Sequence, residues 1–227
     1  MRQVILVLMV MAIAGGAFAQ NLGNSRDISD TTPDVILVPP VEGKTCGDCP
    51  PDGQLEGEPT LVDEYVDAWN GGCNSAPAVF QDINWGLEDT GVAELCGVSG
   101  WYLFTDPDTG GLLNFRDTDW FTATADASGS MEFTVESAYE CYIFQLSVPD
   151  CGSAAVAQQA VVNCNAPMTL SIPTTPGEII YLWVGPTVFV SPDGTTEFPY
   201  FGTLSGHVAG VVATEESSWG GVKSLYR

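Results

Sequence analysis

Apolar and polar residues alternate along much of the chain after about residue 58. Met131, Phe133 and Val135 alternate with polar neighbours, and the segment 168–172 repeats the same period of two. This period is typical of a β-strand with one buried face and one face in water. Other segments are rich in β-branched and aromatic residues and are separated by turn formers: 79–83, 98–104, 120–125, 139–146, 178–184 and 202–212.

These eight segments predict an all-β protein. The 25 Gly and 15 Pro residues, beside only 6 Lys and Arg, argue against a bundle of long salt-bridged helices, and the 45% of hydrophobic residues can form a sizeable core. We expect a two-sheet antiparallel β-sandwich of the jelly-roll kind over residues 58–213. An irregular linker, 20–57, precedes it and contains one apolar run, 35–38, that is expected to form an edge strand. Residues 214–227 are expected to form a solvated C-terminal tail; a recognition tail for sorting or attachment is the alternative.

The first residues have the pattern of a secretory signal. Met1 and Arg2 form a short basic start, residues 4–14 are apolar, and Ala17-Phe18-Ala19 has the small-x-small form that signal peptidase cleaves. The apolar run is shorter than the roughly 18–20 residues that cross a bilayer. We therefore predict a signal peptide over 1–19 and a mature chain without membrane insertion, located in the periplasm, at the cell surface or in the medium.

Seven cysteines fit an oxidising compartment. Cys151 and Cys164 flank a stretch of small residues and are the first pair expected to form a disulfide. Cys73 with Cys96, or either of them with Cys46 or Cys49, is also compatible with the sequence. The odd cysteine is expected to be a buried thiol, with Cys141 as the candidate; an intermolecular bridge is the alternative. A zinc site at Cys46-x-x-Cys49 is disfavoured because the chain has a single His and no second CxxC pair.

The net charge of -23 limits the partners of this protein. A polyanion such as DNA or RNA would be repelled, so nucleic-acid binding is excluded. The single His, His207, lies in a strand-like run, and the chain has no G-x-S-x-G motif to present a serine nucleophile. These features favour a protein that is not an enzyme.

Three segments carry a resemblance to a known family. They are Arg116-Asp-Thr-Asp-Trp-Phe121, Pro176-Gly-Glu-Ile-Ile-Tyr-Leu-Trp-Val184 and Tyr200-Phe-Gly-Thr-Leu204. Over roughly residues 96–212 the chain resembles the bacterial pre-peptidase C-terminal (PPC) domain family, whose members are jelly-roll sandwiches. The lead-in at 56–59 and 66–75 is similar to that of uncharacterised secreted bacterial proteins carrying the same DTDWF strand. These often have a cysteine where this chain has Leu61, so their disulfide pairing does not transfer. The resemblance implies a non-catalytic accessory module outside the cytoplasm.

Two pairs of carboxylates suggest a cation site. Asp117 and Asp119 lie at the start of a strand, and Asp106 and Asp108 lie in a turn with the spacing of calcium-binding loops. Calcium takes six to eight oxygen ligands, which clustered carboxylates and carbonyls supply. We therefore name calcium as the candidate cofactor. The alternative is that these aspartates only cap turns by bonding their own backbone.

Aromatic side chains suggest a binding surface. Trp85, Trp101 and Tyr102 are candidates for stacking on a sugar, with Trp85 the tryptophan expected to be exposed because it lies in a turn-like segment. The sequence thus predicts a secreted, non-catalytic module that has a structural accessory role or binds an extracellular polysaccharide or an envelope protein. A secreted hydrolase and a self-assembling surface protein are the alternatives.

Overall fold

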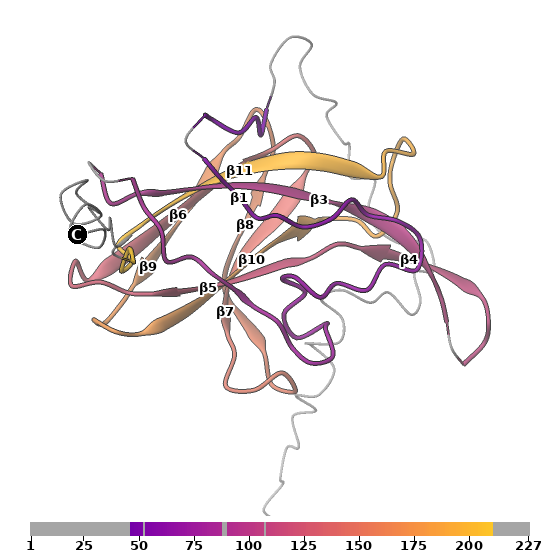
Figure 1. Cartoon of the computed structure of the whole chain (residues 1–227), viewed down its shortest axis with the longest axis horizontal. Coiled ribbons are helices and arrows are strands. Elements are labelled where there is room, and N and C mark those ends of the chain that lie inside the picture. The colour runs from indigo at the N-terminus through magenta and orange to yellow at the C-terminus, as the bar shows by residue number, and fades with distance from the viewer. Residues whose placement is uncertain (1–45, 52, 88–89, 107, 211–227) are drawn as a thin grey trace, which may run out of the picture.

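A computed structural model describes residues 46–51, 53–87, 90–106 and 108–210 (Figure 1). The predicted signal peptide over 1–19, the apolar run at 35–38 and the tail over 214–227 lie outside these residues. The described residues form two β-sheets, and they contain no helix that is long and apolar enough to cross a membrane.

The first sheet has the order β1-β3-β11-β6-β9, with β4 paired to β3. Its strands are β1 Gln54–Leu55, β3 Ala93–Thr105, β4 Leu112–Arg116, β6 Ser130–Ser137, β9 Met168–Pro173 and β11 Glu197–Ser205. The second sheet has the order β2-β5-β10-β7-β8. Its strands are β2 Gln81–Asp82, β5 Asp119–Thr124, β7 Cys141–Ser147, β8 Ala155–Val162 and β10 Ile179–Pro186. Pairing is antiparallel throughout, except for the two-residue strands β1 and β2, which run parallel to β3 and β5.

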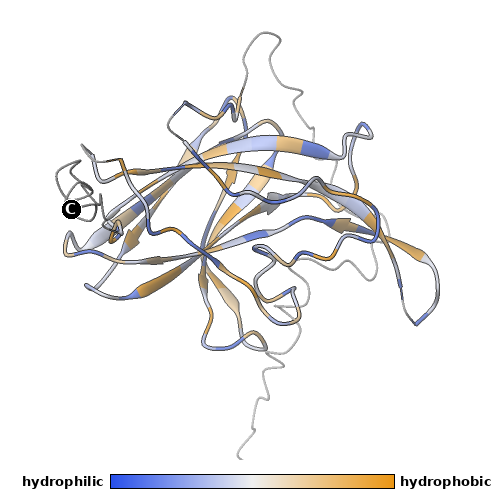
Figure 2. Ribbon diagram, in the orientation of Figure 1, coloured by the Kyte–Doolittle hydropathy of each residue, from blue (hydrophilic) through white to orange (hydrophobic). Residues whose placement is uncertain are grey.

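The eight longer strands apart from β4 form a jelly roll, as the sequence predicts. They follow the order β3-β11-β6-β9 in one sheet and β5-β10-β7-β8 in the other. The main core lies between the sheets and contains the alternating apolar residues of β6, Met131, Phe133 and Val135, all completely buried. Figure 2 shows the hydrophobic residues concentrated on the strands. The all-β sandwich is therefore confirmed.

A second apolar cluster covers the opposite face of the second sheet. Trp120 and Trp183 are fully buried there, and Phe144 stacks on Trp183 with ring centroids 4.6 Å apart. The segment before β2 closes this cluster, because Phe80 contacts Trp120 edge to face and the backbone at Gly72 lies directly against the Trp120 ring. This packing holds residues 70–80 across the outside of the sheet, next to the start of β5.

The last strand differs from its predicted range of 202–212. The structure has β11 at Glu197–Ser205. Pro199 lies within it, opposite Val98, although proline lacks the N–H of a ladder donor and argues against a central strand. Gly206, with a φ of 76°, ends the strand, since most side chains avoid this left-handed conformation.

The disulfides differ from the first pairing expected. The structure has Cys46–Cys164, Cys49–Cys96 and Cys73–Cys151, and the buried Cys141 is the free cysteine. The expected Cys151–Cys164 pair is wrong because β8 runs between these two residues, and an eight-residue strand holds its ends about 23 Å apart. Cys73–Cys96 is not formed either, whereas Cys96 with Cys49 is among the alternatives left open by the sequence.

Gly97 permits a close approach of a tyrosine ring. It lies opposite Tyr200 on β11, and a Cβ at position 97 would be 1.9 Å from Cζ of that ring. We expect Gly97→Ala to lower the free energy of unfolding by about 1–3 kcal/mol, because the ring must move out of a packed site. Gly202→Ala is the matched control, since its new Cβ would make only ordinary contacts of 3.4 Å or more. Urea unfolding of both variants checks this, and equal stability would contradict it.

Candidate functional site

Five carboxylates from two distant parts of the chain meet at one place, which we call the acidic cluster. Glu56, Glu58 and Asp67 lie in the segment between β1 and β2, and Asp117 and Asp119 lie at the start of β5. Two strands of the first sheet border the cluster, because Glu56 accepts hydrogen bonds from the Val98 backbone on β3 and from Tyr200 on β11.

The carboxylates form two overlapping triads. One oxygen each from Glu56, Glu58 and Asp119 lie within 4.8 Å of one another, and the same holds for Glu58, Asp67 and Asp117. Glu58 belongs to both. Three of the five carboxylates are buried: Asp119 completely, Asp117 with 2% exposed and Glu56 with 6% exposed. Glu58 and Asp67 are half-buried.

Neutral donors hold the carboxylates in position. Asn70 Nδ2 donates to Asp119 Oδ1 at 2.9 Å, and the Tyr200 hydroxyl donates to Glu56 Oε2 at 2.8 Å. The Tyr65 hydroxyl donates to Glu58 Oε1 at 2.5 Å. Each of these bonds joins the segment before β2 to itself or to a strand, so the cluster forms only when that segment is docked on the sandwich.

Several oxygens of the cluster have no hydrogen-bond partner although they are buried. They are one oxygen each of Glu58, Asp67, Asp117 and Asp119, and the amide Oδ1 of Asn70. Asn70 is completely buried. A buried polar atom without a partner costs about 1–3 kcal/mol, and more when it is charged. Either protons on the carboxyl groups or a bound cation would offset this cost at the acidic cluster.

Burial raises the pKa of every carboxyl in the cluster, and repulsion between carboxylates adds to the shift for all of them except Asp67. Burial raises the pKa of Glu56 to about 8 and that of Glu58 to about 7, and the neighbouring carboxylates add to both shifts. Burial also raises the pKa values of Asp117 and Asp119 well above their usual range, and that of Asp67 to a smaller degree. The cluster therefore holds protons or another cation near neutral pH.

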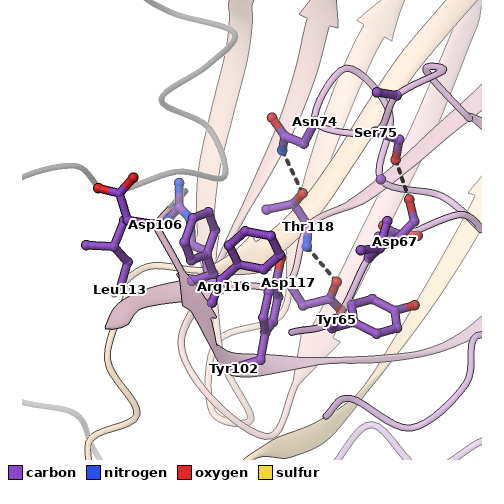
Figure 3. A pocket seen from close by; sticks show the side chains of 15 residues that line it. Tyr65, Asp67, Asn74, Ser75, Tyr102, Asp106, Leu113, Arg116, Asp117 and Thr118 are labelled. Carbon is purple, nitrogen blue, oxygen red and sulfur yellow. Dashed lines mark hydrogen bonds between the residues drawn. The ribbon is translucent and has the colours of Figure 1, made fainter. Parts of the chain in front are cut away.

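A pocket of about 340 Å³ lies against the acidic cluster. Asp67 and Asp117 belong to both the cluster and the pocket wall. Figure 3 shows these two side chains with Tyr65, Tyr102 and further residues around the pocket. Thr118 helps to fix the wall, because its backbone N–H donates to Asp117 Oδ1 at 2.9 Å and its hydroxyl accepts from Asn74 at 2.9 Å. The pocket combines aromatic rings with carboxylates.

The structure separates the two pairs of aspartates proposed from the sequence as a calcium site. Asp117 and Asp119 lie in the acidic cluster, but Asp106 and Asp108 belong to neither triad. Both lie in the turn between β3 and β4, where Asp106 Oδ1 accepts from the Asp108 backbone at 2.9 Å. Asp106 also lines the pocket.

The three aromatic candidates occupy different environments. Tyr102 lines the pocket. Trp101 is only 6% exposed and lies in the main core, where its Nε1 donates to the Val188 carbonyl at 2.8 Å. Trp85 packs half-buried against that core, so its predicted exposure is wrong; Trp69 is 49% exposed instead. The turn-like sequence around Trp85 does not indicate that its side chain packs against the main core.

Sequence reasoning missed Glu56, Glu58, Asp67 and Asn70 as parts of a site. Glu56 falls in the predicted linker, and all four lie far from Asp117 in the chain. The Glu-Gly-Glu-Pro sequence at 56–59 is the local pattern that could have pointed to the site, because it places two acidic residues close together shortly after Cys49. Only the docked geometry reveals that they face Asp117 and Asp119.

No protein-family model and no curated protein matches this chain. Among solved structures, it is similar to the periplasmic inhibitor of g-type lysozyme PliG from Aeromonas hydrophila. The match has a TM-score of 0.33 and 13% sequence identity, and it covers 56% of this chain and 95% of that chain. A likeness at this level does not extend to function.

Proposed function

We propose that this protein is a secreted, non-catalytic β-sandwich module whose acidic cluster binds calcium and whose neighbouring pocket binds a ligand. The single observation that carries the proposal is the set of buried oxygens without partners on Glu58, Asp67, Asn70, Asp117 and Asp119. A cation bound at either triad would contact one oxygen from each of its three carboxylates. Three disulfides support the extracytoplasmic location, because such bonds persist in oxidising compartments.

The donor set favours calcium over other common metals. All the donors are oxygens, from five carboxylates and one amide, whereas zinc prefers nitrogen and sulfur ligands. Calcium accepts six to eight oxygens in flexible geometry, while magnesium demands a compact octahedron and retains waters. The two triads share Glu58, so the cluster has the layout for one ion or for two neighbouring ions bridged by that side chain.

The cation would have a structural as well as a binding role. Glu56, Glu58 and Asp67 belong to the segment before β2, while Asp117 and Asp119 belong to the sandwich. An ion between them would fasten that segment to the start of β5. The same ion would neutralise charges that burial otherwise disfavours.

Calcium titration of the metal-stripped protein by calorimetry tests this proposal. We expect saturable binding at pH 7.5 with release of protons, because carboxylic acids must ionise to become ligands. Asp119→Asn is expected to weaken the calcium affinity by about tenfold or more, as loss of a side chain that holds a metal ion or orients its ligands does. Asp108→Asn is the control, because Asp108 is exposed and lies outside both triads.

Two results would contradict the proposal. Absence of saturable calcium binding would show that the protein has no calcium site. Equal effects of Asp119→Asn and Asp108→Asn on the calcium affinity would show that the site is not the acidic cluster. The non-catalytic part has its own test. If the protein hydrolyses a polysaccharide and Asp117→Asn abolishes that activity, the hydrolase alternative is correct, since perturbed carboxyl groups beside a pocket also suit acid–base chemistry.

A further inference from the structure

One face of the β3–β4 hairpin carries a row of apolar side chains. Tyr102 on β3 lies opposite Phe115 on β4, and Phe104 lies opposite Leu113. Residues two apart on a strand share a face, so these four side chains project to the same side. All four are half-buried and all line the pocket. The hairpin therefore forms an apolar wall of the pocket.

The aromatic rings of this wall contact one another, and we call this set of rings the platform. The rings of Tyr102 and Phe115 are stacked, with centroids 5.7 Å apart and an interplanar angle of 21°. Phe104 meets Phe115 edge to face at 5.5 Å, and Tyr65 meets Tyr102 in the same manner at 5.7 Å. Rings held by one another in this way offer a rigid surface to a flat apolar ligand face.

The carboxylates at the end of the platform belong to the second triad. Asp67 and Asp117 line the pocket, and with Glu58 they place three oxygens within 4.8 Å of one another. The Oδ2 atoms of both aspartates have no hydrogen-bond partner. A cation held by this triad would therefore lie at the pocket wall, where one oxygen from each of the three side chains fills only part of the six to eight ligand positions of calcium.

We propose that a calcium ion held by Glu58, Asp67 and Asp117 is the recognition centre of the pocket and binds two adjacent hydroxyls of a neutral sugar. The sugar ring stacks on the platform formed by Tyr102 and Phe115. This inference rests on the proposed function, because it uses the cation of the acidic cluster, and it adds the chemical class of the ligand.

Charge and polarity select a neutral sugar over other ligands. The chain has a net charge of -23, which repels a polyanionic polysaccharide, even though Arg116 lines the pocket together with Asp67, Asp106 and Asp117. A purely apolar ligand would offer no oxygen to complete the coordination of the calcium ion held by Glu58, Asp67 and Asp117. A neutral sugar offers a C–H face to the rings and hydroxyl oxygens to the cation, so it matches both walls of the pocket.

The test is retention of the protein on immobilised neutral polysaccharides (β-glucan, mannan and xylan), with alginate as an anionic comparison. We expect saturable retention on at least one neutral polysaccharide in millimolar calcium, loss of retention in EGTA, and no retention on alginate. Tyr102→Ala is expected to weaken retention by about tenfold or more, as truncation of a central aromatic contact does. Tyr102→Phe keeps the ring and is expected to retain binding.

Tyr181→Ala is the matched control, because Tyr181 is also half-buried on a strand and contacts an aromatic ring, but does not line the pocket. Calorimetry with calcium is run on every variant. Calcium binding without retention on any neutral polysaccharide would overturn the sugar inference and leave the proposed calcium site standing. Retention that survives EGTA, or that Tyr102→Ala and Tyr181→Ala reduce equally, would also overturn it. Absence of calcium binding would instead overturn the proposed function.

Discussion

In a calcium chelator, the protein is expected to lose stability as the pH rises from about 4.5 to about 8. Burial raises the pKa of Glu56 from 4.5 to about 8 and that of Glu58 to about 7. Between these pH values the unfolded chain releases protons that the folded chain retains, so the free energy of unfolding falls as the pH increases. Below about 4.5 both states are protonated, and the difference disappears.

Calcium is expected to oppose this dependence. The ion competes with protons for the same carboxylates, so its stabilising effect increases as the pH rises through the range. At a hundredfold excess over Kd, binding to the folded state adds about 2.7 kcal/mol. For a domain of this size that corresponds to an increase in Tm of about 5–11 °C at pH 8. Differential scanning calorimetry at pH 5 and pH 8, with calcium and with EGTA, measures the effect.

Asp119→Asn provides a sharp control for this prediction. Asp119 is completely buried, and burial raises its pKa. Asparagine has nearly the same shape and retains the oxygen that accepts from Asn70. In EGTA at pH 8 the variant is expected to be more stable than the wild type, because asparagine is neutral without binding a proton, whereas a buried carboxyl must either stay charged or retain its proton at this pH. In calcium the variant is expected to be less stable. If the wild type keeps the same Tm at pH 5 and pH 8 in EGTA, the acidic cluster does not control stability.

The fold could be predicted where apolar and polar residues alternate strongly. Strands β6 and β9 follow from this period alone, because one of their faces lies in the core and the other in water. Strand β8 was not predicted, since Ala and Gln occupy much of it and neither has a strong β preference. Strand β4 was not predicted either: it is five residues long and pairs only with β3 among the described strands.

The candidate site could be predicted only in part, because its residues are neighbours in space rather than in sequence. Asp117 and Asp119 were identified because they are two residues apart at the start of a strand. Glu56 and Asp67 come from a segment that contains little regular structure, and its position depends on β1, Cys49 and the cluster around Trp120. No local pattern encodes such docking. Asp106 and Asp108, in contrast, meet in a turn, where the Asp106 carboxylate accepts from the Asp108 N–H.

Removal of the Cys49–Cys96 disulfide is expected to reduce both stability and calcium affinity. Loss of a native disulfide typically costs about 2–5 kcal/mol. This bond joins the chain just before β1 to β3, where Leu55 pairs with Cys96 and the Glu56 N–H donates to the Cys96 carbonyl at 3.0 Å. Without it, calcium binding must also order the segment that carries Glu56. Fixing the backbone of a single residue costs about 1–2 kcal/mol in conformational entropy, so the calcium affinity is expected to fall by about tenfold or more.

The Cys46–Cys164 disulfide gives the matched comparison. It closes a longer loop, with a sequence separation of 118 against 47, so its removal is expected to cost at least as much stability. It leaves Cys49–Cys96 in place beside Glu56, however, and calcium affinity is therefore expected to stay close to that of the wild type. The double variants Cys49→Ala/Cys96→Ala and Cys46→Ala/Cys164→Ala are compared by guanidinium unfolding and calcium calorimetry. Only Cys49→Ala/Cys96→Ala releases the segment next to the acidic cluster. Equal losses of calcium affinity in the two double variants would therefore mean that overall stability, rather than the position of Glu56, determines the affinity.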